Sequence, residues 1–243
     1  MARGFTAADT EYFRSTSVSL SAFPVSFACW ALHSDASPAS DVLIQIQDEA
    51  GPSNWARLGL TANGDVRIRS QNAGGGTQAI VGAGSPMVQN TWHHCAGTMT
   101  DAGGGSAWAY MDGTSGSEVT GTMFFPAGID SITIGYANDS TGSDPWNGNI
   151  FWPAVWAAVL SADDITALRK GVPPWVIKPE SLIHFAPLAG SDGNERDWMT
   201  GSAFTETGTV DSVEGPHVSS VGGIIVPSFV SGTTIMVPTG PWR

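Results

Sequence analysis

Short runs of apolar or alternating residues, separated by glycine-rich turns, make up most of this chain. The clearest is in residues 91–113, TWHHCAGTMTDAGGGSAWAYMDG, where successive side chains would point to opposite faces of a strand. The glycines between Asp101 and Gly105 supply the positive-φ positions of a hairpin turn, and residues 106–111 return as the second strand. We therefore expect a central β-hairpin here, with the other strands arranged around it.

The same pattern predicts strands throughout the first 160 residues. Residues 25–33, VSFACWALH, are apolar along most of their length, as is typical of a central strand buried on both faces. Pro153 interrupts the apolar run 149–160 and indicates a bulge or a sheet edge there. Further strands are expected in residues 3–14, 41–48, 55–60, 65–70 and 131–137, with Asn63-Gly64 as a hairpin turn.

One short helix is predicted after residue 160. Ser161 can cap its N-terminus, and Asp164 stands where the acid of a capping box belongs. Ile165 and Leu168 would form its apolar side, and Gly171 occupies the expected stop position. A helix of this length is expected to cover part of a sheet.

Composition agrees with an all-β chain that folds around a sizeable core. The 243 residues include 30 glycines and 15 prolines, which favour short strands and turns over helices. This length allows one large sandwich, or one domain with an appendage. The net charge of −12 argues against nucleic-acid binding, because contact with a phosphate backbone requires basic patches.

Neither an export signal nor a membrane-spanning segment is expected. The first residues contain no apolar core of signal-peptide length, and no apolar run reaches the roughly 18 residues of a membrane helix. We therefore expect synthesis in the cytosol and no membrane partner. Cys29 and Cys95 do not form a disulfide scaffold; a single bridge between them is allowed, although cytosolic synthesis favours free buried thiols.

The order of the motifs resembles the laminin G-like jelly roll of the concanavalin A-like lectin/glucanase superfamily. WHHCAGTM, SAWAYMDG, ITIGYA, WNGNI and LSADDITALRKG follow one another like its successive strands and closing helix. PVSFACWALH and GFTAADTEYF resemble an earlier strand and the opening hairpin, so the resemblance covers about residues 4–171. It implies an all-β, two-sheet antiparallel jelly-roll sandwich. Many relatives have an acidic pair after the WNGNI position, where this chain has Phe151 and Trp152.

The resemblance also gives the two cysteines a meaning. Pentraxins, which are similar in fold, place one cysteine in each of the two strands that match residues 25–33 and 91–99, and bridge them. This implies that Cys29 and Cys95 are neighbours. Whether the two thiols are bridged stays open.

Residues 181–210 resemble a segment that precedes the opening hairpin in most relatives, whereas here it follows the closing helix. We infer a circularly permuted jelly roll, because the termini of such domains commonly lie near each other. The alternatives are a second, truncated jelly roll, for which about 60 residues are too few, and completion of a neighbouring copy by domain swapping. The predicted organisation is a body at 1–171, a segment at 172–217 that completes the same sandwich, and an arm at 218–243.

The last residues differ in character from the rest of the chain. Residues 218–242 contain no charged side chain and are too apolar for a solvated disordered tail. Either they pack along their own domain, or they form an extended arm that lies across a partner subunit or adds a strand to it. The residues expected to make the partner contact are Ile224, Ile225, Val226, Phe229, Ile235, Val237 and Trp242.

No enzymatic chemistry is predicted. Retaining glycoside hydrolysis needs two carboxylates about 5 Å apart, and the E-x-D-x-x-E strand of the superfamily's glucanases is absent. The chain also has no G-x-S-x-G and no H-E-x-x-H motif. His93 and His94 are adjacent on a strand and would face opposite ways, which is unfavourable for a shared metal.

Two kinds of ligand remain as expectations. The first is calcium, the one cofactor that the sequence suggests. Asp192, Asn194 and Asp197 match the acidic loop of the permuted segment and offer the hard oxygen ligands that this ion prefers. An ordinary turn is the simpler explanation of the same residues. For glycans, the candidate stacking platforms are Trp55, Trp146 and Trp152.

The sequence therefore leaves two functional classes open for this protein. The first is a non-enzymatic structural protein of a bacteriophage particle (a capsid decoration, fibre or tail component) attached through its C-terminal arm. Its partners would be other virion proteins and copies of itself, and its location the virion. The alternative is a lectin-like module that binds a cell-surface polysaccharide of the host. The missing signal, the lysine-poor acidic composition and the uncharged arm favour the first class by analogy.

Overall fold

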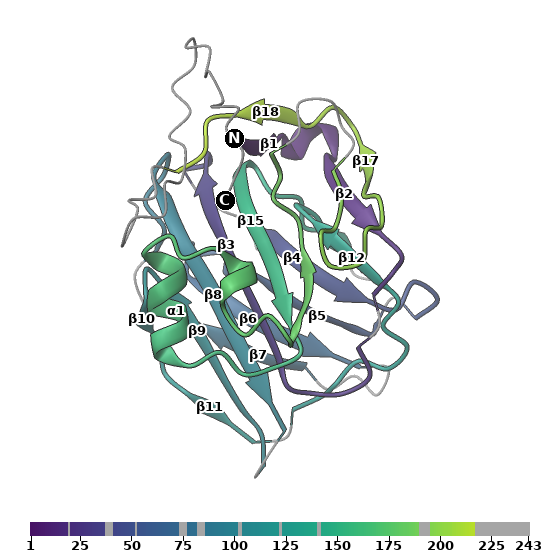
Figure 1. The fold of residues 1–243 in the computed structure, drawn as a ribbon, viewed down its shortest axis with the longest axis vertical. Coiled ribbons are helices and arrows are strands. Elements are labelled where there is room, and N and C mark those ends of the chain that lie inside the picture. The colour runs from purple at the N-terminus through teal and green to yellow at the C-terminus, as the bar shows by residue number, and fades with distance from the viewer. Residues whose placement is uncertain are drawn as a thin grey trace, which may run out of the picture.

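The chain folds as two antiparallel β-sheets packed face to face, with one helix on the outside (Figure 1). This computed structural model describes residues 1–18, 20–36, 41–51, 53–72, 77–81, 86–101, 104–121, 123–139, 142–189 and 195–216. The predicted arm, with Ile224, Ile225, Val226, Phe229, Ile235, Val237 and Trp242, lies outside the described residues, as do Asp192 and Asn194. The all-β jelly-roll sandwich expected from the sequence is confirmed.

The larger sheet has nine strands. Its order is β10 (Thr114–Ser115), β9 (Ser106–Met111), β8 (Trp92–Thr100), β3 (Val25–His33), β15 (Gly148–Trp156), β1 (Ala2–Phe5) and β18 (Asp211–Val213), with β11 (Val119–Thr120) beside β9 and β16 (Leu182–Phe185) beside β15. The predicted central hairpin is β8 and β9, paired from Cys95 with Met111 to Thr100 with Ser106.

The second sheet has seven strands. Its order is β17 (Thr205–Thr207), β2 (Tyr12–Ser15), β12 (Ser131–Ile134), β4 (Val42–Gln47), β5 (Trp55–Leu60), β6 (Val66–Gln71) and β7 (Thr77–Val81). The turn predicted at Asn63-Gly64 joins β5 and β6, and Gly64 has the positive φ that such a turn requires. The remaining short elements are β13 (Asn138–Asp139), β14 (Gly142–Ser143), η1 (Ala7–Asp9) and η2 (Pro174–Val176).

The main core lies between the two sheets. It combines residues of the nine-stranded sheet, such as Phe27 and Ile150, with residues of the seven-stranded sheet, such as Ile44 and Ile68. Gly97 of β8 faces this core, and a Cβ atom there would lie 2.9 Å from Ile68. The two sheets therefore approach each other closely at this point, which explains why the strand has no side chain there.

Cys29 and Cys95 lie opposite each other in the β3–β8 register, inside this core. The neighbour relationship implied by the resemblance is confirmed. Both side chains are free thiols here. Burial raises the pKa of each thiol, so neither is held as a reactive thiolate.

The predicted helix is α1 (Ala162–Arg169), which lies on the outer face of the nine-stranded sheet (Figure 1). Its capping box is present: the Ser161 hydroxyl accepts from the Asp164 N–H, and the Asp164 carboxylate accepts from the Ser161 N–H. Ile165 and Leu168 pack into a second apolar cluster on this outer face. No helix in the described part of the chain is long and apolar enough to cross a membrane.

The segment after residue 172 contributes strands to both sheets. β16 pairs with β15, β17 with β2 and β18 with β1, all within the same chain. A buried ion pair joins this segment to the N-terminal strand: Arg3 Nε lies 3.0 Å from Glu195 Oε1, and Arg3 Nη1 donates to the Val210 carbonyl. That the segment arose by circular permutation stays a prediction.

Candidate functional site

A shallow groove runs along the edge of the seven-stranded sheet, between β2 and β17. Its volume is about 280 Å³. Most of its lining consists of hydroxyl-bearing side chains, joined by one arginine; the lining residues are Tyr12, Arg14, Ser15, Thr16, Ser17, Ser202, Ala203, Thr205 and Thr207. The lining combines residues from opposite ends of the chain, because Tyr12 pairs with Thr207 and Arg14 with Thr205.

Alternation along β2 builds this groove. Phe13 points into the core, so its neighbours Tyr12 and Arg14 point outward. Tyr12 stacks on Tyr136, with ring centroids 4.9 Å apart and planes 15° from parallel. Arg14 forms an ion pair with Glu49, and both side chains remain partly exposed. The groove thus offers a supported aromatic ring, a cation and hydroxyl groups on one side of the sheet.

A row of polar side chains continues from the groove across the outer face of the sheet. From β17 to β6 the members, paired in register, are Thr205, Arg14, Thr133, Gln45, Arg57 and Arg69. Directly paired residues share one face of a sheet. The far end of the row is rich in arginine, an unusual concentration in a chain with a net charge of −12.

Trp55 lies beneath these arginines. The Arg57 guanidinium sits 4.1 Å from the Trp55 ring centroid and that of Arg69 sits 5.2 Å away, which is cation–π geometry. Arg57 also pairs with Asp144 at 3.2 Å. Burial, together with the charges of Arg69 and Arg57, lowers the pKa of Arg67 to about 10. This end of the row is a packed arginine–tryptophan cluster.

Trp55, Trp146 and Trp152 are not the exposed stacking platforms expected from the sequence, because all three side chains are buried. Trp55 is 3% exposed and Trp146 is 0% exposed. Arginines cover the first ring, and the second packs in the inter-sheet core with its edge against His33. Trp152 is 8% exposed, so its ring is also not an open platform. It does, however, lie at the base of an aromatic cluster that reaches the surface.

That cluster begins at a bulge in β15. The register with β3 shifts between Phe151 and Ala154, and Trp152 has a φ of +53°, which is unusual for a bulky side chain. Of the two alternatives that Pro153 indicated, a bulge or a sheet edge, the bulge is present. It puts the adjacent rings of Phe151 and Trp152 on the same face, stacked with centroids 4.6 Å apart.

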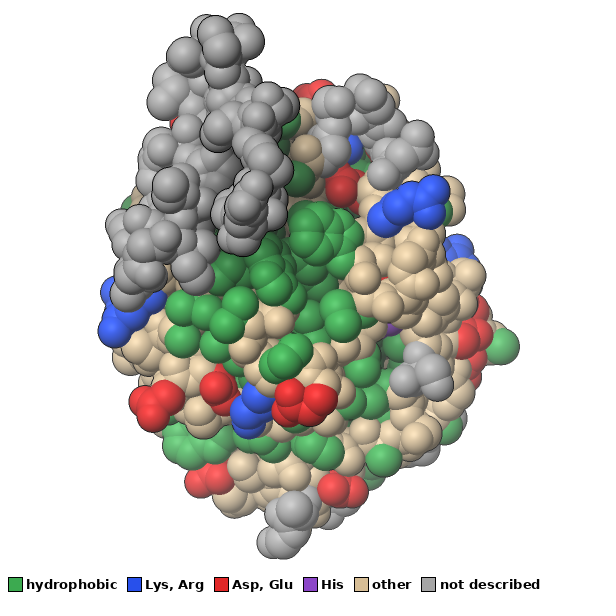
Figure 2. Space-filling view, viewed as in Figure 1, with side chains coloured by type: hydrophobic (Ala, Val, Ile, Leu, Met, Phe, Trp, Pro, Cys, Tyr) green, Lys and Arg blue, Asp and Glu red, His purple; other side chains and the backbone are tan. Residues whose placement is uncertain are grey.

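Two exposed tryptophans complete the cluster, which we call the aromatic patch: Phe151, Trp152, Trp175, Phe185 and Trp198. Trp175 of η2 is 40% exposed and Trp198 is 60% exposed, and their ring centroids lie 5.6 Å apart. Phe185 of β16 contacts both rings. Hydrophobic side chains gather on this face of the molecule in Figure 2. Neither Trp175 nor Trp198 is among the platforms expected from the sequence, although both follow breaks in the strand pattern.

Asp197 anchors the turn that carries the second exposed tryptophan. One carboxylate oxygen accepts from the backbone N–H groups of Phe185 and Met199, at 3.1 and 2.9 Å. The other accepts from the Thr200 hydroxyl at 2.8 Å and lies 2.5 Å from His184 Nδ1. Burial alone would raise the pKa of Asp197, but these hydrogen bonds and the histidine lower it overall.

This arrangement corrects the calcium prediction for Asp197. The carboxylate is fully buried, and both of its oxygens are turned toward protein donors, which leaves a cation no coordinating position. The other two predicted ligands, Asp192 and Asn194, lie outside the described residues. A calcium site that uses them stays a prediction.

One group of metal-type donors occurs in the described part of the chain. The donor atoms of His33, Asp35 and Asp41 lie within 4.8 Å of one another. His33 Nε2 and Asp41 Oδ2 are 2.6 Å apart, and Asp35 Oδ1 accepts from the Asn147 amide. Burial alone would lower the pKa of His33, but the hydrogen bond and charge of Asp41 raise it overall. The His33–Asp41 pair therefore joins the end of β3 to the start of β4, while the Asp35 carboxylate is held by Asn147.

The adjacent histidines of β8 do not share a site. His93 Nδ1 pairs with Asp112 at 2.7 Å. His94 is buried on the other face against Trp30, with ring centroids 5.5 Å apart. Burial lowers the pKa of His94 to about 4, so the ring is neutral at physiological pH.

The architecture is similar to that of several solved structures. A putative carbohydrate-binding protein from Bacteroides ovatus is 18% identical, with a TM-score of 0.63 over 88% of this chain; this chain spans only 60% of that protein. A heptameric pentraxin from Limulus polyphemus is 11% identical (TM-score 0.62, covering 86% of this chain and 92% of the pentraxin). At these identities the likeness shows the fold alone.

A region of a phage protein is similar in fold. The enzymatically active domain of tailspike protein 2 from bacteriophage CBA120 is 14% identical, with a TM-score of 0.56 over 76% of this chain and 29% of the tailspike chain. No curated protein matches this chain by sequence. Residues 7–166 match the family described as the Concanavalin A-like lectin/glucanases superfamily. This match covers well over half of the chain, which therefore belongs to the concanavalin A-like lectin/glucanase superfamily.

Proposed function

We propose that this protein is a non-enzymatic carbohydrate-binding module and that the groove between β2 and β17 holds the sugar. The observation that carries the proposal is the lining of the groove, in which Tyr12 and Arg14 stand among serine and threonine hydroxyls. Sugars combine apolar ring faces with many hydroxyl groups, so their sites need an aromatic surface together with hydrogen-bonding groups. The lectin-like fold supports this proposal.

The groove suits a sugar better than the aromatic patch does. Tyr12 is held in place by Tyr136, so stacking a sugar on it costs little side-chain entropy. Arg14 can donate several hydrogen bonds to ring hydroxyls or to a sugar carboxylate. The exposed part of the patch consists of two tryptophan rings, Trp175 and Trp198, with far fewer groups for hydroxyls.

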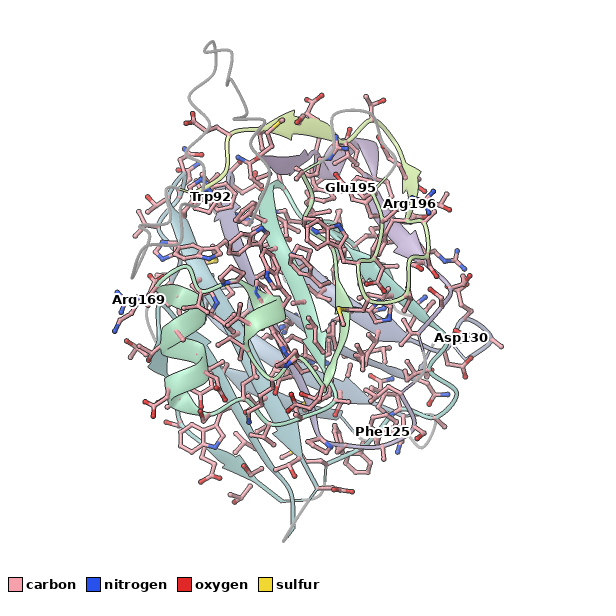
Figure 3. The ribbon with its side chains drawn as sticks, in the orientation of Figure 1. Trp92, Phe125, Asp130, Arg169, Glu195 and Arg196 are labelled. Carbon is pink, nitrogen blue, oxygen red and sulfur yellow. The ribbon has the colours of Figure 1, made fainter. Side chains whose placement is uncertain are left out.

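The test is binding of the full chain to a panel of bacterial surface polysaccharides, followed by calorimetry on any ligand found. We expect Tyr12→Ala and Arg14→Ala each to weaken binding about tenfold or more, that is about 1.4 kcal/mol or more. The matched control is Arg169→Ala, which removes an exposed arginine from α1, far from the groove (Figure 3). Unchanged affinity in both groove variants would exclude the groove as the binding site. If no polysaccharide in the panel binds, that result would count against carbohydrate binding.

Hydroxyl groups and catalysis are tested on the same material. Thr205→Ala should weaken binding, whereas Thr114→Ala, an exposed threonine on β10, should not. A module that only binds leaves a bound oligosaccharide intact, so no new reducing ends should appear during long incubation. Release of reducing ends that the Arg14→Ala variant abolishes would show an enzyme instead.

As a second candidate, we propose that the module is a structural component of a bacteriophage particle, made in the host cytoplasm and attached to other virion proteins through residues 218–243. The likeness to the CBA120 tailspike fold and the absence of charge from residues 218–242 support this candidate. Mass spectrometry of purified particles should detect the chain. A chain that ends at residue 217 should not be incorporated; normal incorporation would exclude attachment through this segment.

A further inference from the structure

The aromatic patch exposes apolar side chains to solvent, and none of its residues lines the groove. Besides Trp175 and Trp198, their sequence neighbours Val176 and Met199 are 52% and 42% exposed. Soluble proteins seldom leave contiguous apolar surface uncovered unless something binds there. Tryptophan in particular favours a partner that buries its ring.

The place where the described chain ends indicates what that partner is. A Cβ atom on Gly215 would lie 3.5 Å from the Met1 backbone and 3.6 Å from the Phe151 ring. Phe151 stands at one end of the series of rings that leads through Trp152 to the exposed tryptophans, so Gly215 brings the chain to that end of the patch. From Phe151 the patch reaches Trp198 in three ring-to-ring steps of less than 6 Å each, through Trp152 and Trp175.

The residues that follow have the matching chemistry. Residues 218–242 carry no charge and would span about 80 Å if fully extended, far more than the patch requires. Their apolar side chains include Ile225, Phe229 and Trp242. Attachment at the edge of the patch gives them a high effective concentration there, so even weak apolar contacts favour binding within the same chain.

We propose that residues 218–242 dock on the aromatic patch of their own chain and bury Trp175 and Trp198. The occupant is an extended apolar segment of this protein, and its docking covers the exposed rings in the free chain. The proposal rests on the patch and on the position of Gly215, not on sugar binding in the groove. The docking proposal and the carbohydrate-binding proposal can therefore fail independently of each other.

The test uses the full chain labelled with 5-fluorotryptophan, with the resonances of Trp175 and Trp198 assigned by tryptophan-to-phenylalanine variants. Phe229→Asp puts a charge into the apolar segment and should release it. We expect both resonances to shift and their broadening by a soluble paramagnetic agent to increase at least twofold. The resonance of Trp156, which is fully buried, is the internal control.

Ser228→Asp is the matched variant, because it adds the same charge one residue earlier and should have a smaller effect. A chain that ends at Pro216 lacks the whole segment and should show the same Trp175 and Trp198 resonances as Phe229→Asp. Agreement between the two proteins would show that the change comes from loss of docking and not from misfolding of one of them. Unchanged Trp175 and Trp198 resonances in both would overturn the proposal. A change that depends on protein concentration and disappears in the monomer would also overturn it, because a second copy would then be the occupant.

Discussion

The buried ion pair between Arg3 and Glu195 gives the sharpest test of how the C-terminal segment is built into the fold. The two side chains are 1% and 4% exposed and come from opposite ends of the sequence. Glu195→Gln keeps the volume of the side chain and removes its charge. It leaves the Arg3 guanidinium charged and surrounded by protein.

The expected magnitude follows from this geometry. Breaking a buried pair from one side costs about 3–5 kcal/mol, because the remaining charge is desolvated without compensation. We expect that cost for Glu195→Gln and for Arg3→Met measured separately. The double variant removes both charges and loses mainly the bond from Arg3 to the Val210 carbonyl, a cost of about 1–2 kcal/mol. The coupling free energy of the cycle should therefore be about 4 kcal/mol or more.

Urea denaturation followed by circular dichroism and by tryptophan fluorescence measures all four proteins. If residues 195–213 belong to the same cooperative unit as the body, both probes should give one transition with the same midpoint. Losses below 1 kcal/mol in the single variants that add up in the double variant would refute this reasoning. So would an early fluorescence transition at which the far-ultraviolet signal of the sheets is unchanged, because the segment would then unfold independently.

The remaining predictions concern protonation and packing. Burial lowers the pKa of His94 to about 4, so between pH 6.5 and 4 the unfolded chain binds a proton that the folded chain does not, and stability falls as the pH decreases. His94 should account for about 3 kcal/mol of that loss. His94→Phe should therefore remove this part of the pH dependence. If the unfolding free energy measured in urea falls with pH as steeply in the variant as in the wild type, His94 is not the group responsible. Gly97→Ala places a methyl group 2.9 Å from Ile68 and should cost about 1–3 kcal/mol. Ile68→Val should recover part of that loss, and a Gly97→Ala protein as stable as the wild type would show that the sheets can separate there without cost.

Local sequence patterns were sufficient for the elements themselves. Three features depend only on residues within a few positions of one another. They are the glycine-rich turn after β8, the Ser161–Asp164 capping box and the bulge at Pro153. Such features are decided by backbone geometry and local hydrogen bonds, which sequence spacing reports directly. The adjacency of Cys29 and Cys95 needed the family resemblance, because no local pattern relates two separate strands.

The surfaces available for binding could not be predicted in the same way. Trp55 and Trp198 are the same residue type, yet arginines from the same strand and a neighbouring one cover the first, and a turn fixed by buried Asp197 exposes the second. The lining residues Tyr12 and Thr207 come together only when β17 adds to the edge of the sheet. Sequence patterns therefore determined the main strands of the first 160 residues and the helix, because these depend on periodicity and short-range contacts, whereas the two-sheet sandwich was implied by the family resemblance. Only the tertiary structure decided which aromatic and polar side chains reach solvent together, because exposure depends on packing between residues far apart in the chain.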